Sequence, residues 1–210
     1  MGFVGTMLLL SGSLFAGHGG VISHVTWHGR EAEIQLAATV PTVCTDGSAG
    51  TISFQINASV DESATLEATG VDTANLAGAL VFIQSSCTSG GYVMGKGQVV
   101  ATVYQQSSVN YANATVNLPI YCVDDNSLLG TLAYDLAWTG TGAQQKQHDD
   151  AHRNMGFYVL IDHSNATYRS ATVTGTATFT GAGGVPNATL STTEASLRSG
   201  SGSRTLQSPN

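Results

Sequence analysis

The residue types best suited to chemistry are gathered in the polar stretch 143–154 and just beyond the apolar run that follows it. His148 and His152 are four positions apart, Asp150 lies between them, and His163 comes later. Imidazole and carboxylate groups are common protein ligands of zinc and copper. If the chain folds back here, these four side chains predict a zinc or copper site. The alternative is a set of solvated side chains that bind nothing, and no Glu follows His148 to complete the His-Glu-x-x-His pattern of zinc proteases.

Two strands are expected to position this stretch. Residues 132–138 carry large apolar side chains at every second position, which is the spacing of one buried strand face. Residues 155–161 are apolar at almost every position, as in a strand covered on both sides. Residues 143–154 show no apolar periodicity, so we expect a long exposed loop that carries the histidines.

A second group of histidines, His18, His24 and His28, lies near the N-terminus. Cleavage just before His18 would expose an amine beside an imidazole, and this pair can bind copper, as in oxidative polysaccharide-cleaving enzymes. Those enzymes need further positioned His and Tyr groups, which the sequence does not identify. The alternative is a polar segment without a ligand.

Other catalytic patterns are missing or unspecific. The sequence contains no Gly-x-Ser-x-Gly elbow and no Gly-rich phosphate loop between a strand and a helix. Asp61, Glu62, Glu67 or Asp135 could contribute to a carboxylate pair for glycoside hydrolysis, but any β-protein offers such pairs. We therefore predict no catalytic residue.

The composition limits the partners. Charged residues make up 10% of the 210 residues, against about a quarter in an average soluble protein, and Ala, Thr, Ser and Gly take their place. This composition suits an exported β-protein. The formal net charge of −7 argues against nucleic acid and anionic lipid as partners, since both need a basic surface. We expect an extracellular ligand or surface component instead.

The N-terminus is expected to be a signal-peptide-like leader, which would make the protein secreted or extracellular. Residues 1–17 are apolar but too short and too rich in Gly and Ser to cross a bilayer, which takes about 20 apolar residues. No later segment is apolar enough to span a membrane. We expect a leader over 1–17, a polar segment over 18–30, a β-domain over 31–198 and a flexible tail over 199–210.

The three cysteines allow at most one internal disulfide. Cys122 ends an apolar alternation, so it should face the core as a small hydrophobic residue. Cys44 and Cys87 lie at strand ends in turns rich in Thr, Ser and Gly. We therefore expect a disulfide between Cys44 and Cys87.

The rest of the chain is expected to form short strands separated by turns. Residues 51–60 alternate most clearly, and residues 171–180 place a threonine at every second position, as on a solvated sheet face. A turn is expected at 61–63 and one helical turn at 72–77. Nine or ten strands without an amphipathic helix predict an all-β fold, a two-sheet antiparallel β-sandwich. A sheet that closes on itself is the alternative.

Four short motifs occur in order: Pro-Thr-Val-Cys at 41–44, Cys-Thr-Ser-Gly at 87–90, Leu-Ala-Trp-Thr-Gly-Thr-Gly at 136–142, and Arg-x-Ala-x-x-x-Gly-Thr at 169–176. With the histidine-bearing stretch between the last two, the chain resembles a family of exported bacterial β-proteins for which no function is known. The resemblance covers residues 44–198 in a scattered way. It implies that Cys44 and Cys87 belong to the shared pattern and that Cys122 does not.

Together these observations predict a non-enzymatic exported domain that acts as a surface, matrix or ligand-binding module. The alternative is a metal-binding protein or metal-dependent enzyme that uses residues 148–163. Four aromatic residues in expected turns are candidates for carbohydrate binding: Trp27, Tyr92, Tyr111 and Tyr168.

Overall fold

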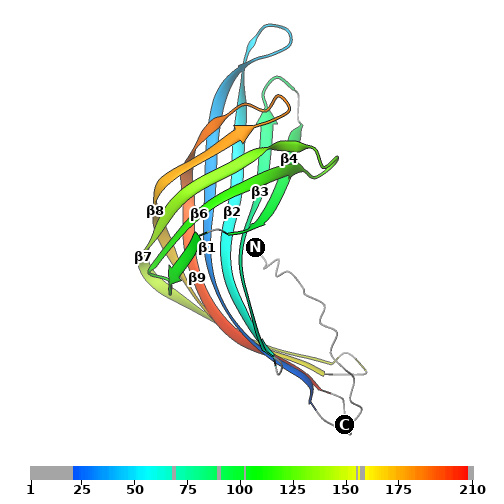
Figure 1. Ribbon diagram of the computed structural model, residues 1–210, viewed down its shortest axis with the longest axis vertical. Helices are drawn as coiled ribbons and strands as arrows, with labels where there is room; N and C mark the ends of the chain where they lie inside the picture. The colour runs from blue at the N-terminus through cyan, green and yellow to red at the C-terminus, as the bar shows by residue number, and fades with distance from the viewer. Residues whose placement is uncertain are drawn as a thin grey trace.

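The computed structural model describes residues 21–67, 70–88, 91–101, 103–154, 156 and 159–207. These residues form an antiparallel sheet of nine strands (Figure 1), with no helix among them. The leader predicted over residues 1–17 and His18 lie outside the described residues. The strands are β1 (Val21–Val43), β2 (Ala49–Glu67), β3 (Gly70–Ser85), β4 (Tyr92–Val100), β5 (Val103–Ser107), β6 (Tyr111–Cys122), β7 (Leu128–Asn154), β8 (Val159–Gly181) and β9 (Ala188–Gln207).

The sheet is continuous and closes on itself. Its strand order is β4-β3-β2-β1-β9-β8-β7-β6-β5, and β4 also pairs with β6 through Gly95↔Cys122 and Lys96↔Tyr121. Glycine permits this close approach, because a Cβ at Gly97 would lie 2.3 Å from the carbonyl oxygen of Pro119. The all-β prediction is confirmed. The structure holds one curled sheet and does not show the predicted division into two sheets.

The core lies between the facing walls of the curled sheet. The rings of Phe54 in β2 and Phe179 in β8 lie 5.3 Å apart. Trp138 of β7 is fully buried, and its Nε1 donates a 3.0 Å hydrogen bond to the carbonyl oxygen of Glu33 in β1. The alternation expected over 132–138 is observed, since all four large side chains are buried: Leu132, Tyr134, Leu136 and Trp138.

Six strands continue beyond the core and form an open sheet, which Figure 1 shows as the narrow lower part of the molecule. We call this part the open half; it comprises residues 21–31, 61–67, 70–75, 142–154, 159–171 and 198–207, and β4, β5 and β6 do not pair with it. Its strands are the extensions of β1, β2, β3, β7, β8 and β9. As a result, β7 reaches 27 residues, whereas strands usually have about 3–10.

The open half corrects several predictions. Residues 143–154, expected as a loop, belong to β7 and pair with β8 from Gln145↔Tyr168 to Asn154↔Val159. Residues 199–207, expected as a flexible tail, belong to β9 and pair on both sides. These segments lack an apolar period because no core covers them, so backbone pairing alone defines them as strands.

The same reason explains the other differences along the chain. The polar segment 18–30 is part of β1 from Val21 onwards. The turn expected at 61–63 and the helical turn expected at 72–77 lie in β2 and β3. Of the strand expected at 155–161, residues 159–161 belong to β8, and residues 155, 157 and 158 lie outside the described residues.

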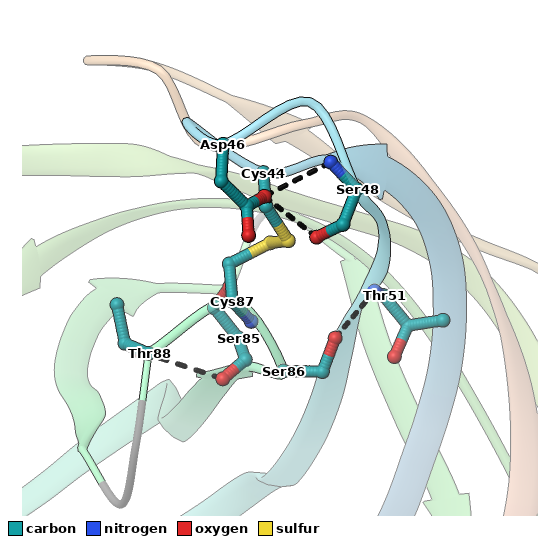
Figure 2. Close-up of a disulfide and its surroundings, with 8 residues drawn as sticks. All are labelled: Cys44, Asp46, Ser48, Thr51, Ser85, Ser86, Cys87 and Thr88. Atoms are coloured by element: carbon teal, nitrogen blue, oxygen red, sulfur yellow. Dashed lines mark hydrogen bonds between the residues drawn. A yellow bond between two sulfur atoms is a disulfide. The ribbon is translucent and has the colours of Figure 1, made fainter.

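The predicted disulfide is confirmed. Cys44 and Cys87 are bonded across a sequence separation of 43 residues and join the end of β1 to the end of β3 (Figure 2). Beside it, Asp46 Oδ1 accepts hydrogen bonds from the Ser48 backbone at 2.9 Å and the Ser48 hydroxyl at 2.6 Å. Cys122 is free and buried, as expected.

Candidate functional site

Every described histidine lies on one face of the open half. We call this face the inner face, because it continues the face that carries the core residues Ala32 and Leu197. Side chains on a strand alternate between two faces, so strand register determines which residues share one. Three neighbouring cross-strand rows, each running from β1 through β9 and β8 to β7, carry the histidines. The rows are His24–Thr205–Ile161–His152, Thr26–Ser203–His163–Asp150 and His28–Ser201–Asn165–His148.

Three of the four predicted site residues meet in this arrangement. Asp150 Oδ2 lies 2.8 Å from His148 Nε2, and Asp150 Oδ1 lies 2.6 Å from His163 Nδ1. His148 Nδ1 lies 2.7 Å from Asn165 Oδ1. Asp150 and His163 are direct register partners, as are His148 and Asn165. The cluster is therefore produced by pairing of the β7–β8 hairpin and not by a loop folding back.

These contacts change the protonation behaviour of two members. The hydrogen bond to Asn165, and then that to Asp150, raise the pKa of His148, because both ring nitrogens face acceptor oxygens. The hydrogen bonds from His163 and His148 lower the pKa of Asp150. The cluster is therefore a carboxylate held between two imidazole rings.

The fourth predicted residue, His152, stands apart from this contact. It shares the inner face, but its register partner is the apolar Ile161. Within the part of the chain that the structure describes, no three His, Cys, Asp or Glu side chains are arranged so that they could hold a metal ion. Both oxygens of Asp150 already contact the two histidines, so metal binding would require them to rearrange.

A shallow groove runs beside this cluster along β9. Two hollows of about 470 and 340 Å³ share His28, Asn165 and Ser201. The floor is residues 199–203, Ser-Gly-Ser-Gly-Ser, whose three serines face inward. The other inner-face residues that line it are Thr26, Arg30, His163 and Thr167. Small side chains on the central strand and larger ones on its neighbours therefore form the groove.

Glycine makes the floor thin. A Cβ at Gly202 would lie 2.4 Å from the carbonyl oxygen of His163 and 2.8 Å from the ring of Trp27 on the opposite face. Trp27 therefore packs over the back of the floor instead of projecting into solvent.

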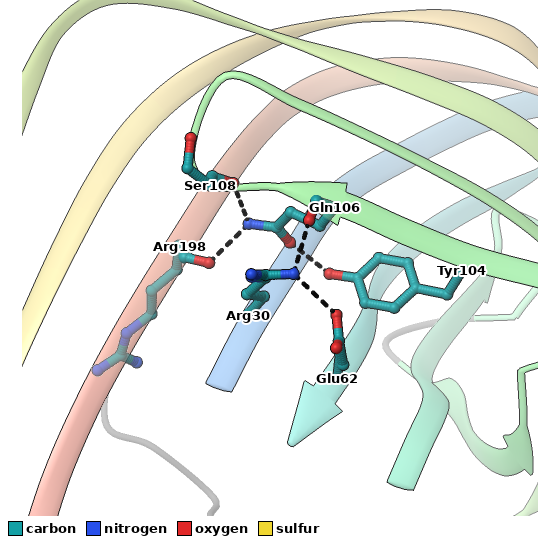
Figure 3. A network of polar contacts seen from close by, with 6 residues as sticks. All are labelled: Arg30, Glu62, Tyr104, Gln106, Ser108 and Arg198. Carbon is teal, nitrogen blue, oxygen red and sulfur yellow. Dashed lines mark hydrogen bonds and ion pairs between the residues drawn. The ribbon is translucent and has the colours of Figure 1, made fainter. Parts of the chain in front are cut away.

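A polar network closes the head of the groove where the core begins (Figure 3). Arg30 Nη1 donates to the Gln106 carbonyl oxygen at 3.0 Å and contacts Glu62 Oε2 at 3.4 Å. The buried Gln106 side chain accepts a hydrogen bond from the Tyr104 hydroxyl, and its Nε2 donates to the Arg198 carbonyl oxygen at 2.8 Å. Short strand β5 thus ties β1 to β9 and separates the groove from the core.

The outer face of the same region carries a carboxyl pair. Glu31 and Asp61 are register partners in β1 and β2, and their side chains share a hydrogen bond. Burial, then the charges of Asp61 and Glu33, raise the pKa of Glu31 to about 8. Arg198 lies 4.0 Å from Glu31 and stacks 4.8 Å from the Tyr168 ring. Neither of the two hollows, which lie on the inner face, is lined by Glu31 or Asp61.

The predicted aromatic candidates do not form one platform. Tyr92 and Tyr111 lie in the remainder of the sheet, which we call the closed half because β4 and β6 pair there, and they are 63% and 42% exposed. Tyr168 lies beneath Arg198, and Trp27 covers Gly202. None of the four side chains stands on the inner face of the open half.

Sequence reasoning missed the groove and the Glu31–Asp61 pair. The signal for the groove is the Ser-Gly-Ser-Gly-Ser alternation, because period two suits a strand with one hydroxyl face as well as the predicted flexible tail. The carboxyl pair gave no local signal, because its members are 30 positions apart and meet only through the β1–β2 register.

None of the residues that the structure places forms a helix able to cross a membrane. No protein-family model, curated protein or solved structure matches the chain.

Proposed function

We propose that this chain is an exported, non-enzymatic binding protein that holds a polar ligand in the groove over residues 199–203. The observation that supports this proposal is the groove itself, lined by hydroxyl, amide, imidazole and guanidinium groups from three strands. Such groups recognise ligands through hydrogen bonds, and a few convergent polar groups in a hollow are typical of a binding site.

The disulfide supports an extracellular setting, since disulfides persist in oxidising compartments. One hydroxyl of the inner face lies beside an imidazole, with Thr205 Oγ1 2.8 Å from His24 Nδ1, but neither residue lines the two hollows. Its polar groups are suited to holding a ligand, and we assign them no catalytic step.

Filling the groove tests the proposal. Ser201 is exposed, lies in both hollows and belongs to β9, so Ser201→Trp should block ligand entry without disturbing the core. Ser191→Trp is the matched control, because Ser191 is an exposed serine of the same strand outside the groove. The readout is binding to an array of neutral and acidic oligosaccharides at two pH values. We expect wild type and Ser191→Trp to bind the same members and Ser201→Trp to bind none; equal binding by all three would exclude the groove.

Zinc or copper binding is the second candidate, and the convergence of His148, Asp150 and His163 favours it. It requires the two histidines to give up their hydrogen bonds to Asp150. We expect a metal-binding protein to melt at a higher temperature with zinc or copper than with a chelator. Asp150→Asn should remove that difference, whereas Asp149→Asn, on the outer face, should keep it. Equal melting of wild type with metal and with chelator would eliminate this candidate.

A further inference from the structure

One edge of β7 is left unpaired in the open half. β6 pairs with β7 only as far as Thr139, whereas β8 occupies the other side of β7 through to Asn154. Among the residues that the structure describes, none offers a backbone partner to the outer edge over 143–154. Such an edge presents a row of free N–H and C=O groups that can pair with another strand. This segment is therefore a candidate surface for strand addition.

The charges near the end of this edge form a pattern that is complementary to itself. Residues 149–153 read Asp-Asp-Ala-His-Arg, with two acids before Ala151 and two basic residues after it. When two copies pair antiparallel with Ala151 opposite Ala151, Asp149 lies opposite Arg153, and this contact occurs twice. In the same register Asp150 lies opposite His152. Opposite charges directly across two strands stabilise their pairing and like charges destabilise it, so a shift that sets Asp149 or Asp150 opposite itself is unfavourable.

The two charged groups of this pattern are available for a second copy. Arg153 is exposed and forms no ion pair with the residues that the structure describes. Asp162, the acid nearest to it in the β7–β8 register, is bonded to Arg204 at 2.7 Å. Asp149 is also exposed, and its Oδ2 accepts a 2.6 Å hydrogen bond from Gln147, which leaves Oδ1 for a guanidinium group.

This register also aligns the two inner faces. Residues directly opposite each other in antiparallel strands point to the same side of a sheet. Asp150 and His152 both lie on the inner face, so the inner faces of the two copies lie on the same side. The two open halves then form one continuous sheet, with six strands from each copy. His152, which stands apart from the cluster of its own chain, lies opposite Asp150 of the second copy.

We propose that a second copy of this chain pairs with the edge of β7 over residues 148–154, about a two-fold axis at Ala151. Each copy contributes seven residues to this contact, against about 20–30 on each side of a stable interface, so the dimer is weak and reversible. The other free edge of the open half, residues 70–75 of β3, contains no basic residue to match the acids of β7. Pairing of β3 with β7 would join copies head to tail and build chains of them instead of closed dimers.

The test is sedimentation velocity of the full-length chain at neutral pH over about a hundredfold range of concentration, since a weak dimer forms only at the upper end. We expect the wild type to shift from monomer to dimer. Arg153→Asp sets like charges opposite each other twice and should weaken the association at least about tenfold, and Asp149→Arg should do the same. The double variant Asp149→Arg/Arg153→Asp exchanges the charges and should restore the dimer.

Lys146→Asp is the matched control. It changes the net charge as much as Arg153→Asp does and lies on the same edge, but residue 146 is outside the paired segment. It should dimerise like the wild type. A loss as large as that of Arg153→Asp would indicate an effect of net charge, or a register that sets Lys146 opposite Asp150, and would overturn the proposal.

An engineered cysteine locates the axis. In the proposed register the two Cα atoms at position 151 lie about 4.5–5.5 Å apart, which is within the range of a disulfide. Ala151→Cys should therefore form a covalent dimer under mild oxidation, and Gln147→Cys, on the same face of β7, should not. Cys122 does not compete, because it is buried.

Four further outcomes would overturn the proposal. They are a wild-type chain that stays monomeric throughout, association that neither single charge reversal weakens, a double variant that does not recover the dimer, and species that grow beyond a dimer. Melting curves of each variant confirm that these exposed substitutions leave the fold intact. Growth beyond a dimer would point to head-to-tail pairing of β3 with β7.

Discussion

Two groups of titratable residues lie on opposite faces of the sheet, and each is expected to affect a different property of the chain. On the outer face, Glu31 is 20% exposed and lies against Asp61. On the inner face, His148 and Asp150 are both more than half exposed. The outer pair should therefore affect the free energy of unfolding, whereas the inner cluster should affect ligand binding.

The pH dependence of stability follows from Glu31. Its folded-state pKa is about 8, against an ordinary 4.5, through burial and the neighbouring carboxylates. The folded chain therefore binds this proton more tightly than the unfolded chain. The stabilisation is complete below about pH 4.5 and is lost as the pH rises through 8. The raised pKa of His148 acts in the same direction, and the lowered pKa of Asp150 reduces stability only in stronger acid.

We therefore expect the melting temperature to fall between about pH 5 and pH 8, corresponding to on the order of 3–4 kcal/mol of unfolding free energy at about 1.4 kcal/mol per pKa unit. Glu31→Gln keeps the shape of a protonated carboxyl group and should flatten this dependence. Glu194→Gln, an exposed change on β9, should leave it as in the wild type. A melting temperature that rises from pH 5 to 8 in the wild type would contradict the assignment.

Individual strands show where sequence periodicity is informative. In the closed half, alternation predicted residues 51–60, 132–138 and 171–180 as strands because a core covers one face. The threonines at 172, 174, 176, 178 and 180 are all exposed, as that pattern required. In the open half, residues 143–154 are almost entirely exposed on both faces. Their sequence therefore has no apolar alternation from which a strand could be recognised.

The candidate site shows the same limit. The types and numbers of His148, Asp150 and His163 were predicted, and the structure brings these three together. His28 and Ser201, which complete the groove, are 173 positions apart and meet only through the β1–β9 register. No local pattern encodes such a pairing.

The close contact between β4 and β6 requires a glycine at position 97. Gly97→Ala would place a Cβ 2.3 Å from the Pro119 carbonyl oxygen and 2.9 Å from the side chain of Ile120. We expect a loss of about 1–3 kcal/mol in unfolding free energy, the usual cost of overpacking. Gly91→Ala is the control, because a Cβ there meets no atom within 4 Å. Equal denaturant midpoints for the two variants would show that closure at Gly97 does not contribute to stability.

The two halves of the molecule differ in burial and in the residues they expose. The closed half holds the buried aromatic residues, the disulfide and the contact between β4 and β6. The open half has few buried side chains and carries every described histidine on one face. Regions with few buried apolar contacts open more easily and often hold binding surfaces. The strand extensions thus present the groove, and the closed half supplies the stability.

The most direct test of this division is amide hydrogen exchange with and without an oligosaccharide that the array identifies as a ligand. We predict that the ligand slows exchange at residues 199–203 of β9 and at the facing parts of β1 and β8 (24–30 and 161–167), while β4, β5 and β6 are unchanged. Protection centred on the closed half, or spread evenly over the chain, would contradict a binding site in the groove.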